Sequence, residues 1–256
     1  MTPNFSKKIE GFKTESGSFS FAYIPWDSEY LQNKTFEISE VRGDFNVAFN
    51  LFASEKDLKK CDLVFAKIVT GDVETQKIIQ SAGFYCIEES AITTLTPDVI
   101  SRLPDSQDTK LVSAAESDLD IVCDMSRDAF CMDRFHRDPA IPAERADFRT
   151  FSWIKNSFAN PDEAVMLLQK DGETIGFFIY GVVDKEADLR LIALAADSRG
   201  KGYGKALYSQ MATHLFSQGC ETITASISLS NQPVLNMYSK LGAKFGHLQF
   251  VYHYTA

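Results

Sequence analysis

The chain has 256 residues, of which 45% are hydrophobic and 24% are charged, a composition typical of a globular protein with one or two domains. Its net charge of −9 disfavours a surface that coats nucleic acid, because neutralising phosphates needs clustered Lys and Arg. We therefore expect small-molecule partners and no nucleic-acid partner.

The five cysteines are odd in number, widely spaced and without a CxxC pair. This pattern predicts neither a disulfide framework nor a bound metal. No apolar core of signal-peptide length follows the first residues, and no apolar stretch approaches the ~18 residues of a membrane span. We expect no membrane partner and a cytoplasmic location.

In chain order, the first break between regions of regular structure is a segment between Leu95 and Lys110, which is rich in proline and turn-forming residues. It predicts a linker and a boundary near residue 106. The chain would then consist of an N-terminal block, 1–106, and a C-terminal block, 107–256.

The C-terminal block alternates strand and helix patterns. Its predicted elements are a strand over 110–113, a helix over 116–130, a loop over 131–142, a helix over 143–158, a hairpin of 164–169 and 174–183, a strand over 189–195, a helix from 205, a strand over 222–228, a helix over 232–241 and a strand over 245–254.

A glycine-rich turn, Arg199-Gly-Lys-Gly-Tyr-Gly204, connects the strand over 189–195 to the following amphipathic helix. The free N–H groups at a helix N-terminus bind anions, and glycines let a pyrophosphate approach the backbone. The spacing fits neither a Walker loop nor a Rossmann fingerprint. The turn therefore predicts a phosphate-bearing ligand.

The pattern of Arg199, Gly202 and Gly204 resembles the acyl-CoA pyrophosphate loop of the GCN5-related N-acetyltransferases (GNAT), and the run from Ile192 to Gly204 is similar to their signature. Ala196 stands where that signature often has proline. The resemblance implies the GNAT α/β fold, a central mixed sheet flanked by helices, and acetyl-CoA as cosubstrate. The cofactor-binding residues that we expect are Ile192, Leu194, Arg199, Gly200, Lys201, Gly202, Tyr203, Gly204, Lys205 and Asn231.

Tyr238 is the candidate general acid. The run Asn231-x6-Tyr238-x3-Gly242 resembles the family motif in which the Asn approaches the pantetheine and the Tyr approaches the thioester sulfur. An ordinary phenol, with a pKa of about 10, can protonate a thiolate at neutral pH. Helix capping by Asn231 and core packing of Tyr238 are the alternatives. No carboxylate stands out as the general base.

The loop over 131–142 carries the candidate acceptor-binding residues Arg134, His136 and Arg137. They could bind acceptor phosphates, and Phe135 offers a face for a base or a sugar. A polar surface loop is the alternative interpretation.

The N-terminal block has the features of a degenerate copy of the C-terminal block. A shift of 159 residues aligns Gly43 with Gly202 and Gly83 with Gly242, and it preserves the apolar pattern between them. The shift predicts a helix over 45–60, a strand over 63–69 and a helix over 74–82. Phe45 replaces Gly204 and Asp44 replaces Tyr203. We therefore expect no CoA binding by the N-terminal block.

Two segments resemble two-block proteins related to TDP-fucosamine acetyltransferase: the run Pro25-Trp-Asp-Ser28 and the loop that begins Asp133-Arg-Phe-His136. This narrower resemblance implies transfer of an acetyl group to the 4-amino group of a nucleotide-linked 4-amino-4,6-dideoxy sugar. Tyr30-Leu-Gln32 departs from the relatives' Phe-Phe-Gly, which leaves the acceptor open. Alternative acceptors are a small amine, an amino acid or a protein N-terminus, and a catalytically silent acyl-CoA-binding module is the non-enzymatic alternative. A homodimer also stays open.

Overall fold

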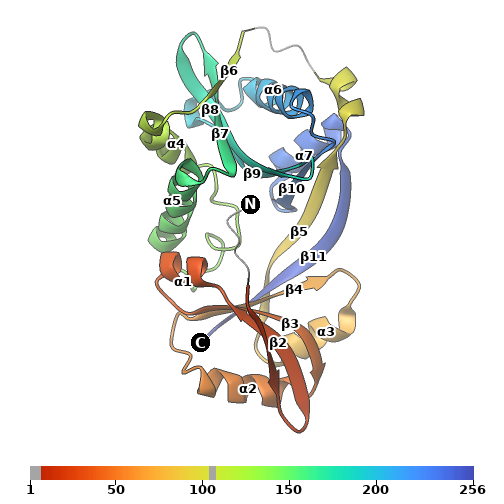
Figure 1. Cartoon of the computed structure of the whole chain (residues 1–256). Helices are drawn as coiled ribbons and strands as arrows, with labels where there is room; N and C mark the ends of the chain where they lie inside the picture. Colours follow the sequence, from red (N-terminus) through yellow and green to blue (C-terminus); the bar gives the residue numbers. More distant parts are fainter. Residues whose placement is uncertain (1–6, 104–107) are drawn as a thin grey trace. The chain divides into compact units, whose positions relative to one another are not determined.

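The computed structural model describes residues 7–103 and 108–256, whose contacts group them into two compact units (Figure 1). The glycine-loop unit contains Ala91–Cys131 and Thr150–Gly246. The phenylalanine unit contains residues 7–90, Met132–Arg149 and His247–Ala256. The predicted boundary near residue 106 lies outside the described residues. Each unit takes segments from both halves of the sequence, so the units are not divided by a single cut.

The glycine-loop unit is built on a mixed sheet. Strands β6 to β9 pair antiparallel in chain order, β9 pairs with β10 in parallel, and β5 is the other neighbour of β10. Its elements are β6 (Lys110–Ser113), α4 (Leu119–Ser126), β7 (Glu163–Lys170), β8 (Glu173–Val183), β9 (Glu186–Leu194), α6 (Tyr203–Ser217), β10 (Thr222–Ser228) and α7 (Gln232–Leu241). The elements β5 (Tyr85–Leu95), α5 (Ala143–Ala159) and β11 (Lys244–Thr255) have residues in both units.

Both faces of this sheet are covered. On β8 the adjacent residues Phe177 and Phe178 are fully buried in different clusters, because successive strand side chains point to opposite faces. Helix α6 packs on β8, β9 and β10, and α4 packs on β8 and β9 (Figure 1). Burial on both sides explains why β8 has a continuous apolar run in place of alternation.

The segment predicted to be a linker is packed structure up to Leu103. Leu95 ends β5, and Pro97–Arg102 forms a 3-10 helix. Leu95 and Val99 are 0% and 1% exposed and belong to the same apolar cluster as α6. The linker interpretation is wrong for these residues, because Pro97 starts a short helix that has its own buried face.

The helix predicted over 116–130 is shorter in the structure. A 3-10 turn, Glu116–Asp118, leads into α4, which ends at Ser126. There the Ser126 hydroxyl donates to the Cys123 carbonyl at 2.6 Å, a local bond that competes with continuation of the helix.

The strands of the phenylalanine unit also pair in both directions: β1, β2 and β3 pair antiparallel, β3 pairs with β4 in parallel, and β4 pairs antiparallel with β11. Rings fill its core and pack edge-on or stacked around Phe49 and Phe52. Its elements are β1 (Ile9–Lys13), β2 (Gly17–Tyr23), α1 (Pro25–Leu31), β3 (Thr35–Gly43), α2 (Phe45–Glu55), β4 (Leu63–Val69) and α3 (Val73–Ser81).

Helix α2 ends at Glu55, five residues before the predicted end. Asp57 adopts a left-handed conformation, with φ 49°, and the N–H groups of Asp57 and Leu58 bond to the carbonyls of Ser54 and Ala53. These two bonds make a Schellman ending in which Asp takes the place of the usual glycine.

The elements of the two halves repeat at the predicted spacing. Leu63 and Thr222, which begin β4 and β10, are 159 positions apart. The same spacing relates the starts of β5 and β11 and those of α3 and α7. The sheets also agree, because β3–β4 and β9–β10 are each the parallel pair after an antiparallel hairpin.

The halves differ where the glycine turn should be. Strand β3 runs to Gly43 and α2 begins at Phe45, whereas eight residues separate the end of β9 at Leu194 from the start of α6 at Tyr203. The N-terminal half instead carries α1 between β2 and β3, where the C-terminal half has a tight turn. In the N-terminal half, the insertion of α1 before β3 and the shorter connection after β3 compensate in length. The overall spacing therefore stays near 159, and the loss of the loop is not visible in the sequence alignment.

Among the helices of the described residues, none combines the length and the hydropathy that a membrane-spanning helix requires.

Candidate active site

The glycine turn leaves β9 and enters α6 through two left-handed residues. Gly200 has φ 74° and Gly202, the N-cap of α6, has φ 91°. A Cβ at either position would meet no atom within 4 Å. Glycine is therefore favoured here because it adopts the left-handed conformation and leaves the surface of the turn open. At Gly204 a Cβ would lie 3.4 Å from Met237 Cε, so a larger side chain would collide with α7.

The main-chain donors of this turn are free to bind an anion. Ser198 and Arg199 donate to the carbonyls of Ala195 and Ala196, and Lys205 donates to that of Gly202. Between them, the N–H groups of residues 200–204 have no acceptor within the described part of the chain. Five consecutive free donors at the positive end of a 15-residue helix form a cradle for phosphate oxygens.

The charged side chains of the turn have two roles. Arg199 fastens the turn, because its Nε donates to the Leu194 carbonyl at 3.1 Å and its Nη1 donates to the Asp128 carbonyl at 3.2 Å. Lys201 and Lys205 are exposed and can offer positive charge to a phosphate. The sequence analysis assigned Arg199 to the ligand, and in the structure these two bonds position the loop.

Strands β9 and β10 separate beside the turn. Their parallel pairing joins 186–188 to 222–224, although β9 continues to Leu194 and β10 to Ser228. Within the described residues no further pairing joins them, so one edge of each strand, including that of Ile192 and Leu194, is available to an extended ligand. This is where the sequence predicted the pantetheine arm.

Asn231 and Tyr238 are both on α7. The Asn231 side chain accepts a bond from the Val234 N–H at 3.3 Å and so caps the helix, as one sequence interpretation stated. Tyr238 is 1% exposed, and its hydroxyl has no hydrogen-bond partner of good geometry among the described residues. A buried phenol without a partner costs free energy and needs an explanation.

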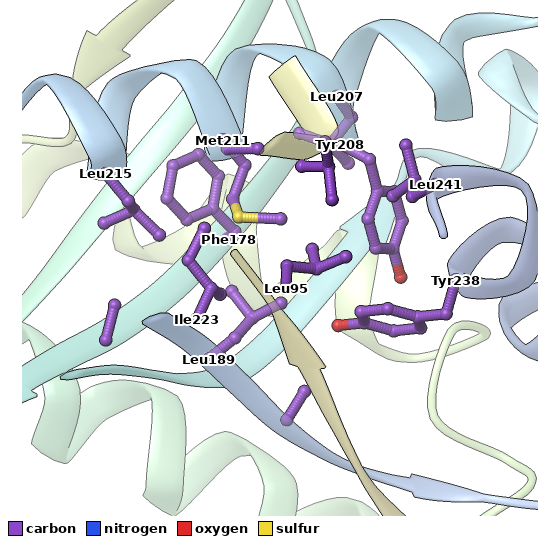
Figure 2. Packing of buried hydrophobic residues seen from close by; sticks show 14 of the residues in the cluster. Leu95, Phe178, Leu189, Leu207, Tyr208, Met211, Leu215, Ile223, Tyr238 and Leu241 are labelled. Carbon is purple, nitrogen blue, oxygen red and sulfur yellow. The ribbon is translucent and has the colours of Figure 1, made fainter. Parts of the chain in front are cut away.

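A second buried tyrosine, Tyr208 of α6, packs against the first. The two ring centroids are 5.3 Å apart with an interplanar angle of 86°, and the Tyr208 hydroxyl end points toward Tyr238 (Figure 2). The Tyr208 hydroxyl also lacks a partner of good geometry among the described residues. Thr93 of β5 is fully buried, and its hydroxyl donates to the Ala225 carbonyl of β10 at 3.2 Å.

These groups influence one another's ionisation. Burial raises the pKa of Tyr238 above that of an ordinary tyrosine, and the hydroxyls of Thr93 and Tyr208 lower it in part. Burial, together with Tyr238, raises the pKa of Tyr208 well above its usual range. Of the two phenols, Tyr238 is therefore the one whose ionised form its neighbour favours. Sequence analysis missed Thr93 and Tyr208, because Tyr208 has the helical spacing of a core residue and Thr93 comes from the other half of the chain.

A sequence model described as the acetyltransferase (GNAT) family matches residues 128–243, which include the turn, both separating strands and Tyr238. These residues form a GNAT domain. The chain is accordingly an enzyme of the acetyltransferase type, as the glycine turn predicted.

Relatives extend the similarity beyond this domain. The chain is 22% identical over 233 residues to the spore coat polysaccharide biosynthesis protein SpsD of Bacillus subtilis, covering 89% of this chain and 80% of that protein. A GCN5-related N-acetyltransferase from Sphaerobacter thermophilus aligns with TM-score 0.64 at 12% identity, covering 94% of this chain and 81% of that one.

A tandem GNAT protein from the clavulanic acid biosynthesis pathway aligns with TM-score 0.61 at 11% identity, covering 98% of this chain and 83% of that one. The structural likeness confirms the predicted GNAT fold, with an additional GNAT-like block in the N-terminal half.

The three predicted acceptor residues of the GNAT domain lie in the phenylalanine unit. Arg134 is enclosed there: its guanidinium stacks between Phe65 and Phe135, at 4.0 and 4.3 Å from their ring centroids. Its Nη2 lies 3.9 Å from Asp27, which also accepts a bond of 2.7 Å from Arg149 Nε. The Trp-Asp-Ser and Arg-Phe-His segments that carried the narrower resemblance are therefore partners in one buried ion cluster.

His136 bridges two carboxylates in the same unit, through Nδ1 to Asp133 at 3.0 Å and Nε2 to Asp147 at 3.1 Å. The bond with Asp133 raises the pKa of His136, so this imidazole favours its charged form. Arg137 is exposed. The structure thus separates the predicted site into two groups, with Tyr238 and the glycine turn in one unit and these three residues in the other.

His253 belongs to the same ion cluster, but its pKa is shifted in the opposite direction to that of His136. Its Nδ1 donates to Asp138 at 2.7 Å, and its Nε2 lies 3.2 Å from Arg134 Nη1, which can only donate, so the ring is neutral with its proton on Nδ1. Burial lowers the pKa of His253 to about 4. Burial alone would raise the pKa of Asp138, yet bonds from His253, Ala140 and Tyr85 lower it.

Proposed function

We propose that the enzyme transfers the acetyl group of acetyl-CoA to a primary amine by direct attack. The observation that carries this proposal is the run of five free N–H groups over residues 200–204, beside the edges that β9 and β10 leave unpaired. The N–H groups hold the pyrophosphate, and the strand edges hold the pantetheine arm. Lys201 and Lys205 supply charge to phosphates, and Tyr203 and Gly204 keep the entrance of α6 open.

Tyr238 is the general acid of this proposal. It breaks its O–H bond and forms an S–H bond on the departing thiolate, while the attacking nitrogen gives up the proton that restores the phenol. Its burial supports the role, because a phenol held away from water stays protonated across the physiological pH range.

Tyr238→Phe tests this role. We expect kcat to fall by about 100-fold, within the usual contribution of general acid catalysis, while the dissociation constant of acetyl-CoA stays the same. Tyr180→Phe is the matched control, because Tyr180 is a partly buried tyrosine of the same unit whose hydroxyl bonds to His214. Unchanged turnover in Tyr238→Phe would remove the acid role.

The proposed acceptor is a nucleotide-linked 4-amino-4,6-dideoxy sugar. The support is the similarity along most of the chain to a protein named for polysaccharide biosynthesis, and the pairing of both resembling segments in one cluster. Release of free thiol from acetyl-CoA should be measured with nucleotide-linked amino sugars, small amines, amino acids and peptide N-termini. Release with the amino sugars alone is expected, and release with another class reassigns the acceptor.

Arg137 is the residue through which acceptor binding is best tested. Arg137→Ala should raise the acceptor KM several-fold and leave the acetyl-CoA KM unchanged, since one charge-assisted hydrogen bond to a phosphate is removed. Arg137 is chosen because it is the exposed one of the three candidates, and Arg134 and His136 remain in the proposed acceptor site. An unchanged acceptor KM in Arg137→Ala would dismiss a role in acceptor binding.

The N-terminal block, 1–106, in this proposal, binds no CoA and supports the GNAT domain. The absence of a loop between β3 and α2 and the burial of Phe45 support this division. Calorimetric titration of the full chain should give one acetyl-CoA per chain, and a stoichiometry of two would contradict it.

A further inference from the structure

Tyr208 of α6 and Tyr238 of α7 place two phenolic hydroxyls within one apolar cluster, and Thr93 of β5 lies in the same unit. Tyr208 and Tyr238 are 6% and 1% exposed, and Thr93 is fully buried. Apolar side chains, among them Leu95, Leu207 and Leu241, surround the two rings (Figure 2). Two phenolic hydroxyls are thus withdrawn from water and left without good partners, which a purely structural core would avoid by using phenylalanine.

We propose that Tyr208 is a positioning residue that acts through Tyr238, directing its hydroxyl at the Tyr238 oxygen when that oxygen loses its proton. This inference rests on the acid role of Tyr238 proposed above. The inference explains why two neighbouring hydroxyls are left without partners. The free energy cost of burying both is offset when Tyr238 ionises and its oxygen accepts a hydrogen bond from Tyr208.

The chemistry requires such donors. Burial opposes the charged form of Tyr238, and an isolated buried phenol would release its proton to a thiolate too reluctantly. When the carbon–sulfur bond breaks, the Tyr238 O–H bond breaks and the S–H bond forms. The phenolate then accepts a hydrogen bond from Tyr208 until the proton lost by the attacking nitrogen restores it. No proton, electron or reagent is left over.

The direction of each pKa shift agrees with this order of events. The hydroxyls of Thr93 and Tyr208 lower the pKa of Tyr238, whereas Tyr238 raises that of Tyr208. Tyr208 therefore keeps its proton and donates, and Tyr238 is the member of the pair that ionises.

Tyr208→Phe is the decisive variant, because phenylalanine keeps the edge-to-face ring contact with Tyr238 and removes only the hydroxyl. We expect kcat to fall by about 10- to 100-fold, the range for a hydrogen bond to a charged group, with an unchanged acetyl-CoA dissociation constant and acceptor KM. Tyr180→Phe again serves as control and should retain turnover.

A double-mutant cycle separates positioning from structure. On the Tyr238→Phe background, Tyr208→Phe should cause no further loss of kcat, because the group on which it acts is gone. A merely structural role would lower kcat equally on both backgrounds. Equal loss, or full turnover in Tyr208→Phe alone, overturns this inference and leaves the acid role of Tyr238 standing. Full turnover in Tyr238→Phe removes the acid role itself.

Discussion

The two strand-to-helix connections of this molecule, β9 to α6 and β3 to α2, begin from the same arrangement of parallel strands and end in different chemistry. In the glycine-loop unit the connection has two left-handed glycines and five free N–H groups. In the phenylalanine unit the connection is a single residue, and Phe45 of the first helical turn is 1% exposed in the core. The β9-to-α6 connection is left open for an anion, whereas aromatic rings fill the corresponding position at the start of α2. The difference teaches that packing and binding compete for the same position of this fold.

The largest expected effect tests whether rings hold the phenylalanine unit together. Phe49 is 1% exposed and contacts Phe45, Phe84 and Tyr254. Phe49→Ala should destabilise the protein by about 3–5 kcal/mol, measured by denaturant unfolding, because it leaves a cavity between these rings. Leu51→Ala, on the same helix but 53% exposed, should cost much less. Equal costs would deny the packing role.

The next variant places the residues of the β3-to-α2 connection at the equivalent positions of the β9-to-α6 connection. Tyr203→Asp with Gly204→Phe gives α6 the residues that begin α2, Asp44 and Phe45. We expect acetyl-CoA affinity to fall by about 100-fold or more, because a carboxylate repels phosphate and the ring must displace Met237. Calorimetric titration measures the affinity, and thermal unfolding checks the fold. Retained affinity would show that this turn does not hold the cosubstrate.

The two units should also differ in their response to acid, because His253 of the phenylalanine unit is buried in its neutral form. Its folded pKa of about 4 lies below the ordinary value of 6.5, so the unfolded chain binds more protons between these pH values. Stability should fall as the pH is lowered through this window. His136, with a raised pKa, has the opposite effect: the stability that it contributes is lost as the pH rises through its folded pKa.

His253→Gln isolates the first contribution. Unfolding free energies should be measured between pH 7 and 4.5 in this variant and in the unchanged protein. The variant should lose less stability over this range, since the depressed titration is absent. An identical pH dependence would contradict the neutral, buried state of His253.

The smallest expected effect compares two glycines with left-handed backbones and open surroundings, Gly200 of the binding turn and Gly71 of the phenylalanine unit. Alanine at either position should cost about 1 kcal/mol of stability, from backbone strain alone. Acetyl-CoA affinity should fall only for Gly200→Ala, because a methyl group there stands among the free donors. An equal change in affinity for both variants would place the cradle elsewhere.

Local patterns determined most of the secondary structure. The apolar periods and the caps of α6, α7 and β10 suffice for their bounds, since Gly202, Asn231 and Gly242 fix helix ends through short-range bonds. The glycine turn and the Asn231-x6-Tyr238 spacing likewise indicated the binding and acid candidates, because each motif lies within one or two adjacent elements. The spacing of 159 was visible because β4, α3 and β5 begin 159 positions before β10, α7 and β11.

Only the tertiary structure decided which segments share a core. Leu95 and Thr93 precede the predicted boundary, yet they belong to the unit that holds Tyr238. Arg134 is of a residue type that commonly binds phosphate, but in the structure its guanidinium interacts with Asp27 and His253. The physical reason is that burial and pairing depend on residues far apart in the chain, and the sequence records these contacts with no fixed spacing. The order of elements follows from local chemistry, and the assignment of each side chain to core or site follows from the fold.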